Sequence, residues 1–484
     1  SLPVENVRAE LNSPEAMSLK RRLLREALTL VRNRDQLIPF AELDSLQLAS
    51  LSIGAGSKTL FQKRLDAYAS FTHRQVGKAL SDKEQVRLVE QLKAFDAVVV
   101  SLHDMSQYAS REFGITQATR RLIDRLREHT RVVLVVFGSP YSLRYFDAVD
   151  WVLEAYEENE MTQDLAAQAL FGAFAIRGRL PVTASPRSPY NAGVTTNPSF
   201  RMGFSLPEET GLSSDTLQRI DALARRAVKL RATPGCVVLV AKNGQVVFQR
   251  AYGYHTYQRK RSVRVDDVYD LASVTKILAS TLAVMKLYEE GRLDLDAPLR
   301  RYLPDLAATN KSDLILRDVM AHHAGLIGWI PFYKQTLSGS RRNPRPSPAF
   351  YHRYPDEDYA IPVTGRLHLR RDFADSIRAQ IRRSELRPTR GYKYSDLGFY
   401  LIAEIVEQIA GQPLDEYVEA TFYRPMGLRT ATFRPWRRLP LDLVPPTEED
   451  RYFRCEQVRG YVHDMGAAML GGVSGHAGDR KSVV

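Results

Sequence analysis

The first 185 residues alternate short apolar runs of strand length with longer amphipathic runs of helix length. The expected strands cover 46–53, 97–102, 131–137 and 151–156. The expected helices cover 59–68, 82–95, 116–129 and 163–176, with an amphipathic opening stretch at 16–31. Strands that are apolar along their whole length are buried on both faces, which is typical of parallel sheets covered by helices. The sequence therefore predicts an α/β fold with a doubly wound, mostly parallel sheet over residues 1–185.

Length and local composition divide the chain further. A chain of 484 residues is longer than one hydrophobic core normally serves, so two or more domains are expected. Residues 186–210 are rich in proline, serine, asparagine and glycine, which indicates a linker. After it we expect a helix to residue 230, and Asn243-Gly244 predicts a tight hairpin between strands at 236–242 and 245–252. Residues 211–484 are the expected second domain.

The clearest chemistry lies in an S-x-x-K motif formed by Ser273 and Lys276. We expect Ser273 where a loop enters a helix, and residues three apart share one helix face, so the ammonium can reach the serine oxygen. Serine is a weak nucleophile until a neighbouring base takes its proton, and a lysine in a partly dry pocket can do so or tune the group that does. An apolar stripe at helical spacing is expected to bury the following helix: Ile277, Leu278, Leu282, Met285 and Leu287.

Other patterns exclude several function classes. The net charge is +12, but no zinc spacing or aromatic RNA-binding signature accompanies it, so no nucleic-acid partner is expected. The stretch 54–59, Gly-Ala-Gly-Ser-Lys-Thr, has serine where a phosphate-binding loop requires glycine before the lysine, so we expect only a turn there. The histidines show no metal-ligand spacing, and neither a metal nor a cofactor is expected. His322 and His323 are expected to be structural residues of a loop.

Targeting signals and cysteines say little about the compartment. The longest apolar runs are of strand length, far below the about 20 residues of a membrane span, so no transmembrane segment is expected. No signal-peptide pattern is visible, and the chain begins with Ser1 rather than methionine, as a processed protein or a fragment would. Cys236 and Cys455 are too few for a disulfide framework.

The first domain resembles a known family at both of its ends. Residues 27–33 followed by 37–40 (Leu-Ile-Pro-Phe) are similar to the opening of the C-terminal α/β sandwich domain of family-3 glycoside hydrolases, of the bacterial β-N-acetylglucosaminidase type. Residues 155–172 and the closing Gly178-Arg179-Leu180-Pro181-Val182 resemble the end of that domain. In such enzymes the catalytic residues lie on a preceding (β/α)8 barrel, and this chain has no such barrel. No glycosidase residue is therefore carried over.

The second domain resembles the serine β-lactamase and penicillin-binding protein family, in its class-C-like and esterase-like branch. The helix, the hairpin, the S-x-x-K motif, Gly291–Leu299 and His322–Leu326 occur in the family's order. The resemblance implies an α+β β-lactamase/transpeptidase-like fold. The family's second catalytic motif, Y-x-N, corresponds to Tyr394-Ser395-Asp396, with aspartate in place of the more common asparagine.

The resemblance implies catalytic roles for three residues. Ser273 attacks a carbonyl carbon and becomes acylated, while backbone N–H groups, that of Ser273 included, stabilise the oxyanion. Tyr394 beside the Lys276 ammonium can take the serine proton, because the opposite charge favours its phenolate. Alternatively Lys276 is itself the base, and the sequence leaves that choice open. Asp396 is the expected substrate-binding residue.

Two stretches depart from the family pattern. Gly475-His476-Ala477-Gly478 looks like the third motif, H-x-G, but related sequences carry such a segment well before the true third motif. We therefore expect a domain that is truncated at its C-terminus, ending in an unrelated tail at residues 479–484. Residues 338–374 are rich in arginine and proline and are expected to be either a lid over the acyl site or a mobile, structureless excursion.

Together the two resemblances imply a bacterial cell-wall-associated hydrolase, a serine acyl hydrolase of the β-lactamase, D-Ala peptidase or esterase type. Its expected partners are peptidoglycan-derived or other acyl and glycan substrates, and its expected location is periplasmic or secreted. The alternative is a catalytically silent fragment or a non-catalytic binding or scaffold protein.

Overall fold

The computed structural model describes residues 11–199, 201–340 and 342–482. Residues 1–10 of the expected first domain and residues 483–484 of the expected tail lie outside this range, as do residues 200 and 341. The described part of Ser1–Ala224 forms one compact unit together with Val238–Arg250. A second unit comprises Arg225–Val237 and the described part of Ala251–Val484.

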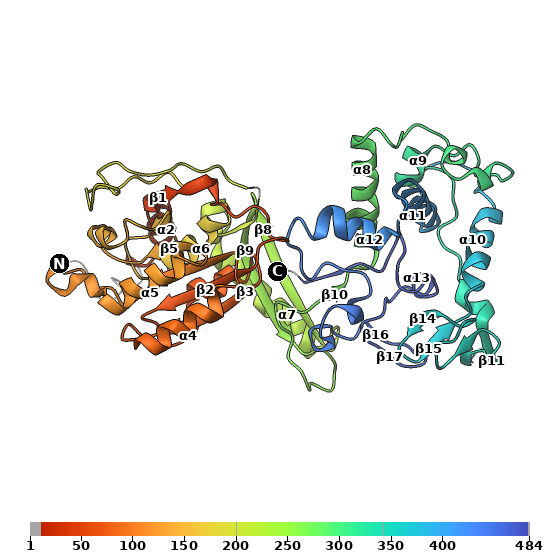
Figure 1. Ribbon diagram of the computed structural model, residues 1–484. Coiled ribbons are helices and arrows are strands. Elements are labelled where there is room, and N and C mark those ends of the chain that lie inside the picture. The colour runs from red at the N-terminus through yellow and green to blue at the C-terminus, as the bar shows by residue number, and fades with distance from the viewer. Residues whose placement is uncertain (1–10, 200, 341, 483–484) are drawn as a thin grey trace, which may run out of the picture. The chain divides into compact units, whose positions relative to one another are not determined.

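A six-stranded sheet forms the centre of the first unit (Figure 1). Its strands run in the order β1-β6-β5-β4-β2-β3, and all pairs are parallel except β1 with β6. The bounds are β1 Thr29–Asn33, β2 Leu48–Ile53, β3 Phe71–Val76, β4 Ala97–Leu102, β5 Arg131–Val136 and β6 Trp151–Glu154. The predicted mostly parallel sheet is thereby confirmed.

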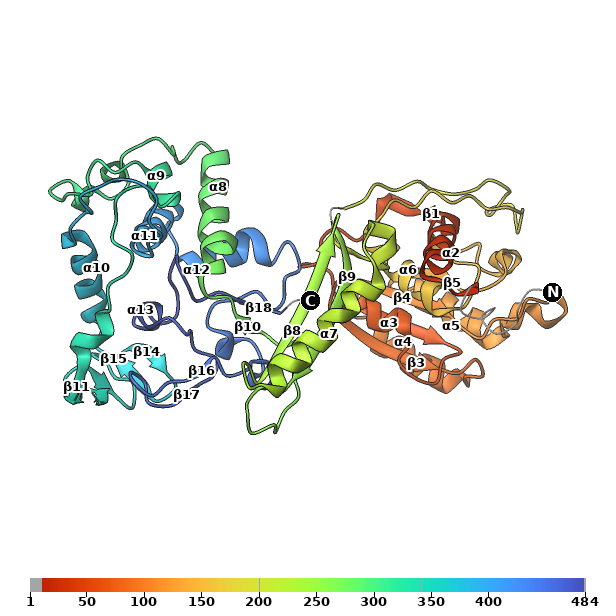
Figure 2. The same cartoon turned by 180° about the vertical axis from the view of Figure 1, so that it is seen from behind.

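Helices cover both faces of this sheet, as Figure 2 also shows from behind. The helices are α2 Pro14–Ala27, α3 Leu60–Leu65, α4 Asp82–Leu92, α5 Gln117–Arg127 and α6 Glu160–Leu170. Successive strand residues point to opposite faces. Val99 and Val133 accordingly pack with residues of α3 and α6, whereas Val98 and Val132 pack with residues of α4 and α5. The doubly wound arrangement expected from the apolar runs is therefore correct.

Two details of the first unit differ from the sequence-based expectation. The amphipathic stretch 16–31 is not one helix, because α2 ends at Ala27 and Thr29 already belongs to β1. Strand β3 was not predicted at all. It pairs only with β2 at the edge of the sheet and has no buried residue, so it lacks the apolar run that the central strands carry.

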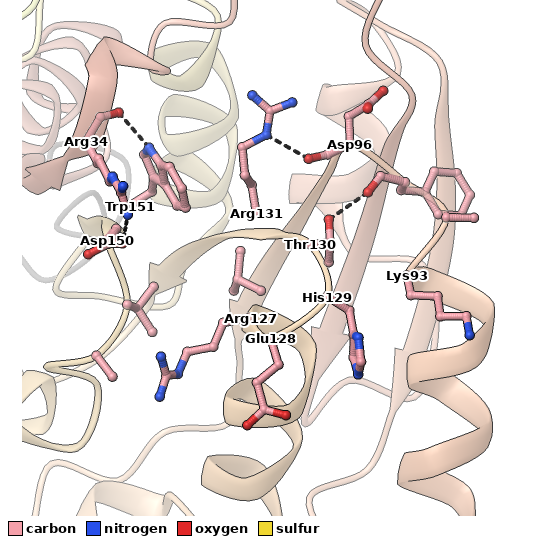
Figure 3. A pocket seen from close by; sticks show the side chains of 15 residues that line it. Arg34, Lys93, Asp96, Arg127, Glu128, His129, Thr130, Arg131, Asp150 and Trp151 are labelled. Atoms are coloured by element: carbon pink, nitrogen blue, oxygen red, sulfur yellow. Dashed lines mark hydrogen bonds and ion pairs between the residues drawn. The ribbon is translucent and has the colours of Figure 1, made fainter.

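A cavity of about 530 Å³ lies at the amino ends of β4, β5 and β6 (Figure 3). Its basic side chains have structural partners. Lys93 and Arg127 lie at the carboxyl ends of α4 and α5, where cations complement the helix dipole. Arg131 donates to the carbonyl oxygen of Asp96 at 2.9 Å, and Arg34 contacts Asp150 (3.2 Å). These contacts account for the basic lining without an anionic ligand.

The described residues of the expected linker, 186–199 and 201–210, belong to the first unit. The amide of Val194 donates to the carbonyl of Leu30 at 2.7 Å, and that of Thr196 to Ile176 at 3.1 Å. At Gly193 a Cβ would lie 2.5 Å from the carbonyl oxygen of Gly178, so only glycine allows this close approach. The expected boundaries of the two domains remain a proposal.

The predicted hairpin follows helix α7 (Ser214–Lys229) and consists of β8 (Gly235–Lys242) and β9 (Gln245–Gly253). Its turn residues Asn243 and Gly244 both have positive φ, 53° and 73°, as a type I′ turn requires. Strand β9 also pairs in parallel with β7 (Gly203–Phe204), which gives the order β7-β9-β8.

The second unit is built around α11, whose residues from Leu397 to Ala403 are all buried in its main core. Its helices are α8 Leu282–Glu289, α9 Leu316–Met320, α10 Phe373–Arg383, α11 Leu397–Ala410, α12 Leu414–Val418 and α13 Met465–Ala468. Its strands are β10 Tyr269–Asp270, β11 Leu337–Ser340, β12 Asn343–Pro346, β13 Tyr351–His352, β14 Ile361–Thr364, β15 Leu367–Leu369, β16 Glu448–Glu449, β17 Gln457–Val458 and β18 Arg480–Lys481.

The described residues of the stretch 338–374 include strands, so the stretch is not structureless, and its mobility stays a prediction. It forms the β11–β12 hairpin and the three-stranded sheet β13-β15-β14. Tyr351, Val363 and Leu369 from this stretch are buried in the core of the second unit. The role of a lid stays a prediction. Within the described ranges, no helix combines the length and apolar character needed to cross a bilayer.

Candidate active site

The S-x-x-K motif begins the helical region that leads into α8. Ser273 lies in a short 3-10 turn, Ala272–Val274, and a π-helical segment, Lys276–Thr281, continues directly into α8. Ala272 has a φ of +44°, a strained value for a non-glycine residue, and its amide donates to Asp270 at 2.8 Å. Strained residues and π-helical turns both concentrate at functional sites. Ser273 itself is exposed, as an attacking group must be.

Lys276 brings the sequence-predicted residues together. Its Nζ atom lies 2.9 Å from Ser273 Oγ, 2.6 Å from Tyr394 Oη and 2.7 Å from Asp396 Oδ1. The carbonyl oxygen of His476 is a further acceptor at 3.5 Å. Lys276 is only 3% exposed, whereas Tyr394 is 43% exposed. The arrangement thus holds a buried cation beneath two hydroxyl groups.

The loop around His322 fixes the segment that carries Tyr394 and Asp396. The amide of Asp396 donates to the carbonyl of Gly328 at 2.9 Å, and the amide of Ser395 donates to His322 Nδ1 at 3.2 Å. The rings of His322 and Tyr394 lie 4.6 Å apart, centroid to centroid. The Nδ1 atom of His322 carries no proton because it accepts the hydrogen bond from Ser395, and burial, followed by the charge of Lys276, lowers the pKa of His322. His322 was expected only as a loop residue, and its contact with the site was not foreseen.

A second set of polar residues packs behind Lys276. His476 is 1% exposed, and its ring contacts Asp464 Oδ1 and Ser474 Oγ at 2.8 Å each. The carbonyl of Gly475 accepts a hydrogen bond from Ser280 Oγ at 2.7 Å. A Cβ at Gly475 would lie 2.1 Å from the carbonyl oxygen of Phe399, so this position requires glycine. The stretch 475–478 thus forms a wall behind Lys276.

The stretch after this wall is packed beside the S-x-x-K motif. Strand β18 pairs antiparallel with β10, and the amide of Asp479 donates to Thr275 Oγ1 at 3.1 Å. Arg480 is 1% exposed and contacts Asp270 (3.3 Å). Burial raises the pKa of Asp479 to about 6. Residues 479–482 therefore pack against the residues on either side of the S-x-x-K serine.

The expected apolar stripe after Lys276 is partly wrong. Ile277 and Met285 are 60% and 59% exposed, while the buried positions of this helical region include Ala279, Ala283 and Val284 as well as Leu287. The π-helical turn shifts the phase of the helix by one residue relative to an α-helix, so the buried face is displaced from the predicted one.

The pair Asp464–His476 gives a pH-dependent prediction. Burial alone would raise the pKa of Asp464, but the charge and hydrogen bond of His476 outweigh it and lower the pKa to about 2 from an ordinary 3.8. A carboxylate with a depressed folded-state pKa stabilises the fold above its unfolded-state pKa and loses this contribution as the pH falls. Between pH 5 and 2 the wild type should lose on the order of 2 kcal/mol of unfolding free energy relative to Asp464→Asn.

Denaturant unfolding at a series of pH values measures this difference. Asp296→Asn is the control, because it removes an exposed carboxylate paired with Arg317 and should change the pH dependence little. Parallel stability–pH curves for the wild type and Asp464→Asn would contradict the prediction.

Comparison with known proteins identifies both halves of the chain. Residues 23–213 match the family model described as glycosyl hydrolase family 3 C-terminal domain. Residues 220–445 match the model described as beta-lactamase. The chain joins a glycosyl hydrolase family 3 C-terminal domain to a beta-lactamase-fold domain. The β-lactamase/penicillin-binding-protein-like fold of the second half and the resemblance read from the sequence are thereby confirmed.

Curated relatives match about half of the chain. A protein of Escherichia coli strain K12 named "Putative D-alanyl-D-alanine carboxypeptidase" is 30% identical over 299 residues, covering 57% of this chain and 63% of that protein. A protein of the same name from Salmonella agona strain SL483 is 29% identical over 300 residues, covering 56% of this chain and 62% of its own length. The chain thus spans less than two thirds of the length of these relatives.

Matches among solved structures have low TM-scores. A class C beta-lactamase from Rhodobacter sphaeroides has a TM-score of 0.36 and 21% identity, covering 55% of this chain and 62% of that one. An octameric penicillin-binding protein homologue from Pyrococcus abyssi has a TM-score of 0.40 and 19% identity, covering 55% of this chain and 54% of that one.

Proposed function

We propose that the beta-lactamase-fold domain is a serine acyl hydrolase in which Ser273 is the nucleophile. The observation that carries the proposal is the position of Lys276 Nζ, which lies within 2.9 Å of both Ser273 Oγ and Tyr394 Oη. A serine whose hydroxyl shares a buried cation with a phenol has a base within reach and a charge that favours its deprotonation. The proposed catalytic residues are therefore Ser273, Lys276 and Tyr394.

The reaction has two steps. Tyr394, as the phenolate, takes the proton of Ser273 while Oγ bonds to the carbonyl carbon of the substrate. The bond from that carbon to the leaving group then breaks, Tyr394 passes the proton to the leaving group, and an acyl-enzyme ester remains. In the second step Tyr394 takes a proton from water as the water oxygen bonds to the ester carbon; the bond to Oγ breaks, and Tyr394 returns the proton to Ser273. Backbone N–H groups, including that of Ser273, stabilise the oxyanion in both steps. In the alternative, Lys276 takes the serine proton instead.

The names of the relatives favour a D-alanyl peptide of the cell wall as the substrate. A β-lactam or a simple ester offers the same carbonyl chemistry, and both serve as probes of the site. The glycosyl hydrolase family 3 C-terminal domain favours a function close to glycan. The proposed location is periplasmic or secreted. The role in substrate binding expected for Asp396 stays a prediction, and the KM of Asp396→Asn tests it.

The function is tested by release of D-alanine from an acyl-D-Ala-D-Ala peptide and by hydrolysis of nitrocefin and p-nitrophenyl acetate. Turnover of any of the three that disappears in Ser273→Ala supports the proposal, and the fastest of the three indicates the substrate class. A folded protein that turns over none of them, and that no labelled penicillin or fluorophosphonate modifies, would instead be a binding or scaffold protein.

Replacing Tyr394 by phenylalanine tests the assignment of the base. The variant keeps the ring beside His322 and loses only the hydroxyl group that contacts Lys276. Turnover should fall by about 10²–10⁴-fold, the range typical of general acid–base groups, with an unfolding free energy close to that of the wild type. Tyr392→Phe is the matched control, because Tyr392 is exposed and should be silent. Wild-type turnover in Tyr394→Phe would leave Lys276 as the base.

A further inference from the structure

The charges around Lys276 point to a role for Asp396 that its place in the sequence motif does not reveal. An ammonium has three N–H donors, and Lys276 has three acceptors within 2.9 Å: Ser273, Tyr394 and Asp396. Each proton therefore has its own acceptor. Only one of the three acceptors, Asp396 Oδ1 at 2.7 Å, carries a full negative charge.

The other groups that face the ammonium are neutral or weakly polar. The ring centroids of Tyr394 and Phe399 lie 4.6 Å and 5.6 Å from Nζ, which gives a cation–π attraction. The carbonyl of His476 lies at 3.5 Å, and its ring is directed to Asp464 instead. His322 accepts the amide hydrogen of Ser395 at Nδ1, and burial and the lysine charge lower the pKa of its ring. Among the described residues, Asp396 is the carboxylate that forms an ion pair with Lys276.

Burial makes this ion pair effective. The side chains of Lys276 and Asp396 are 4% and 18% exposed, so water screens their attraction only weakly. The carboxylate also cancels part of the field that the ammonium exerts on Tyr394 Oη, 2.6 Å away on the same nitrogen. It thus compensates the charge of Lys276 and weakens the positive field at the phenol oxygen. An asparagine in the same place, as the related motif has, would do neither.

We propose that Asp396 is a positioning residue that acts as the charge partner of Lys276 and moves the working range of the site to higher pH. This inference rests on the proposed acyl-transfer function. Whichever of Tyr394 and Lys276 is the base, it must lose a proton to act, and the negative charge of Asp396 opposes that loss. Removing the charge should therefore let the base form appear at lower pH.

The test compares the pH dependence of kcat/KM in Asp396→Asn and in the wild type, with p-nitrophenyl acetate as an uncharged substrate. The variant preserves the shape of the side chain and removes its charge. The acidic limb of the profile of kcat/KM against pH should shift to lower pH by roughly 1–3 units, the range for a charge at this distance. KM should change by less than about twofold. Asp396→Glu should restore the limb of the wild type, because it restores the charge. Asp296→Asn is the control for net charge, because Asp296 lies far from the motif in the sequence and pairs with Arg317. This variant should leave the acidic limb of the pH profile unchanged.

A different pattern of results would overturn the inference alone. An unchanged limb with a raised KM would make Asp396 a residue that contacts substrate and not the charge partner of Lys276. If Asp396→Asn does not fold, Asp396→Ser supplies a second neutral side chain for the same comparison.

A readout without turnover separates this inference from the proposed function. The Cε resonance of ¹³C-labelled Lys276, assigned by its loss in Lys276→Met, should titrate at lower pH in Asp396→Asn than in the wild type. Unchanged titration of Lys276 would contradict the charge-partner role even in a protein without turnover. Conversely, a shifted titration in a protein that no acylating probe labels would contradict the proposed function only.

Discussion

Replacing Ser273 by alanine is expected to abolish acylation, lowering turnover by on the order of 10⁵-fold or more. The change removes one oxygen atom, which accepts a hydrogen bond from Lys276 at 2.9 Å and lies at an exposed position. The ammonium of Lys276 contacts this oxygen and the phenol of Tyr394 at the same time. The unfolding free energy should stay within about 1 kcal/mol of the wild-type value, since no buried apolar group is lost.

Turnover of p-nitrophenyl acetate and nitrocefin, measured beside a mock preparation, gives the comparison. Ser280→Ala is a useful contrast, because Ser280 is buried and bonds to the carbonyl of Gly475. It should cost stability and leave the nucleophile in place. Turnover in Ser273→Ala above the mock level would refute the assignment.

Replacing Lys276 by methionine is expected to cost a similar factor in turnover. The side chain keeps its approximate volume but loses the charge that contacts Ser273 and Tyr394. Because residues that act as one unit are not additive, the double variant Ser273→Ala/Lys276→Met should be no slower than either single variant. The measurement is the acylation rate in single-turnover experiments.

The same variant should also destabilise the fold, because it leaves the Asp396 carboxylate without its partner at a site of low exposure. Breaking such a pair from one side costs roughly 3–5 kcal/mol when the pair is fully buried, and less here. Adding Asp396→Asn should restore stability but not turnover. Recovery of turnover in that double variant would contradict the role of Lys276.

The parallel sheet could be predicted from the sequence, because a strand that is buried on both faces needs apolar residues along its whole length. Ala97–Leu102 was predicted with the bounds that the structure has, since each of its residues is buried. Strand β3 carries no such run, because it lies at the sheet edge and is half-exposed. The hairpin at Asn243-Gly244 was predicted correctly for a local reason, the positive φ of both residues.

The candidate site was partly predictable for the same kind of reason. The contact of Ser273 with Lys276 follows from a spacing of three residues, whereas that of Lys276 with Tyr394 joins residues 118 apart. The latter was expected only through the family resemblance. Two other contacts depend on tertiary packing, and no local sequence pattern predicts them: Asp464 with His476, and His322 with Ser395. The π-helical turn, likewise, displaced the buried face that an α-helical reading predicts.

The most direct test of the central claim is to locate the covalent acyl-enzyme. The folded protein is incubated with a fluorophosphonate or a labelled penicillin, digested, and sequenced by mass spectrometry, with Ser273→Ala treated in parallel. We predict one added mass on the peptide that contains Ser273 and none in the variant. An adduct on another residue, or an unmodified Ser273 in protein whose circular dichroism shows it to be folded, would contradict the account.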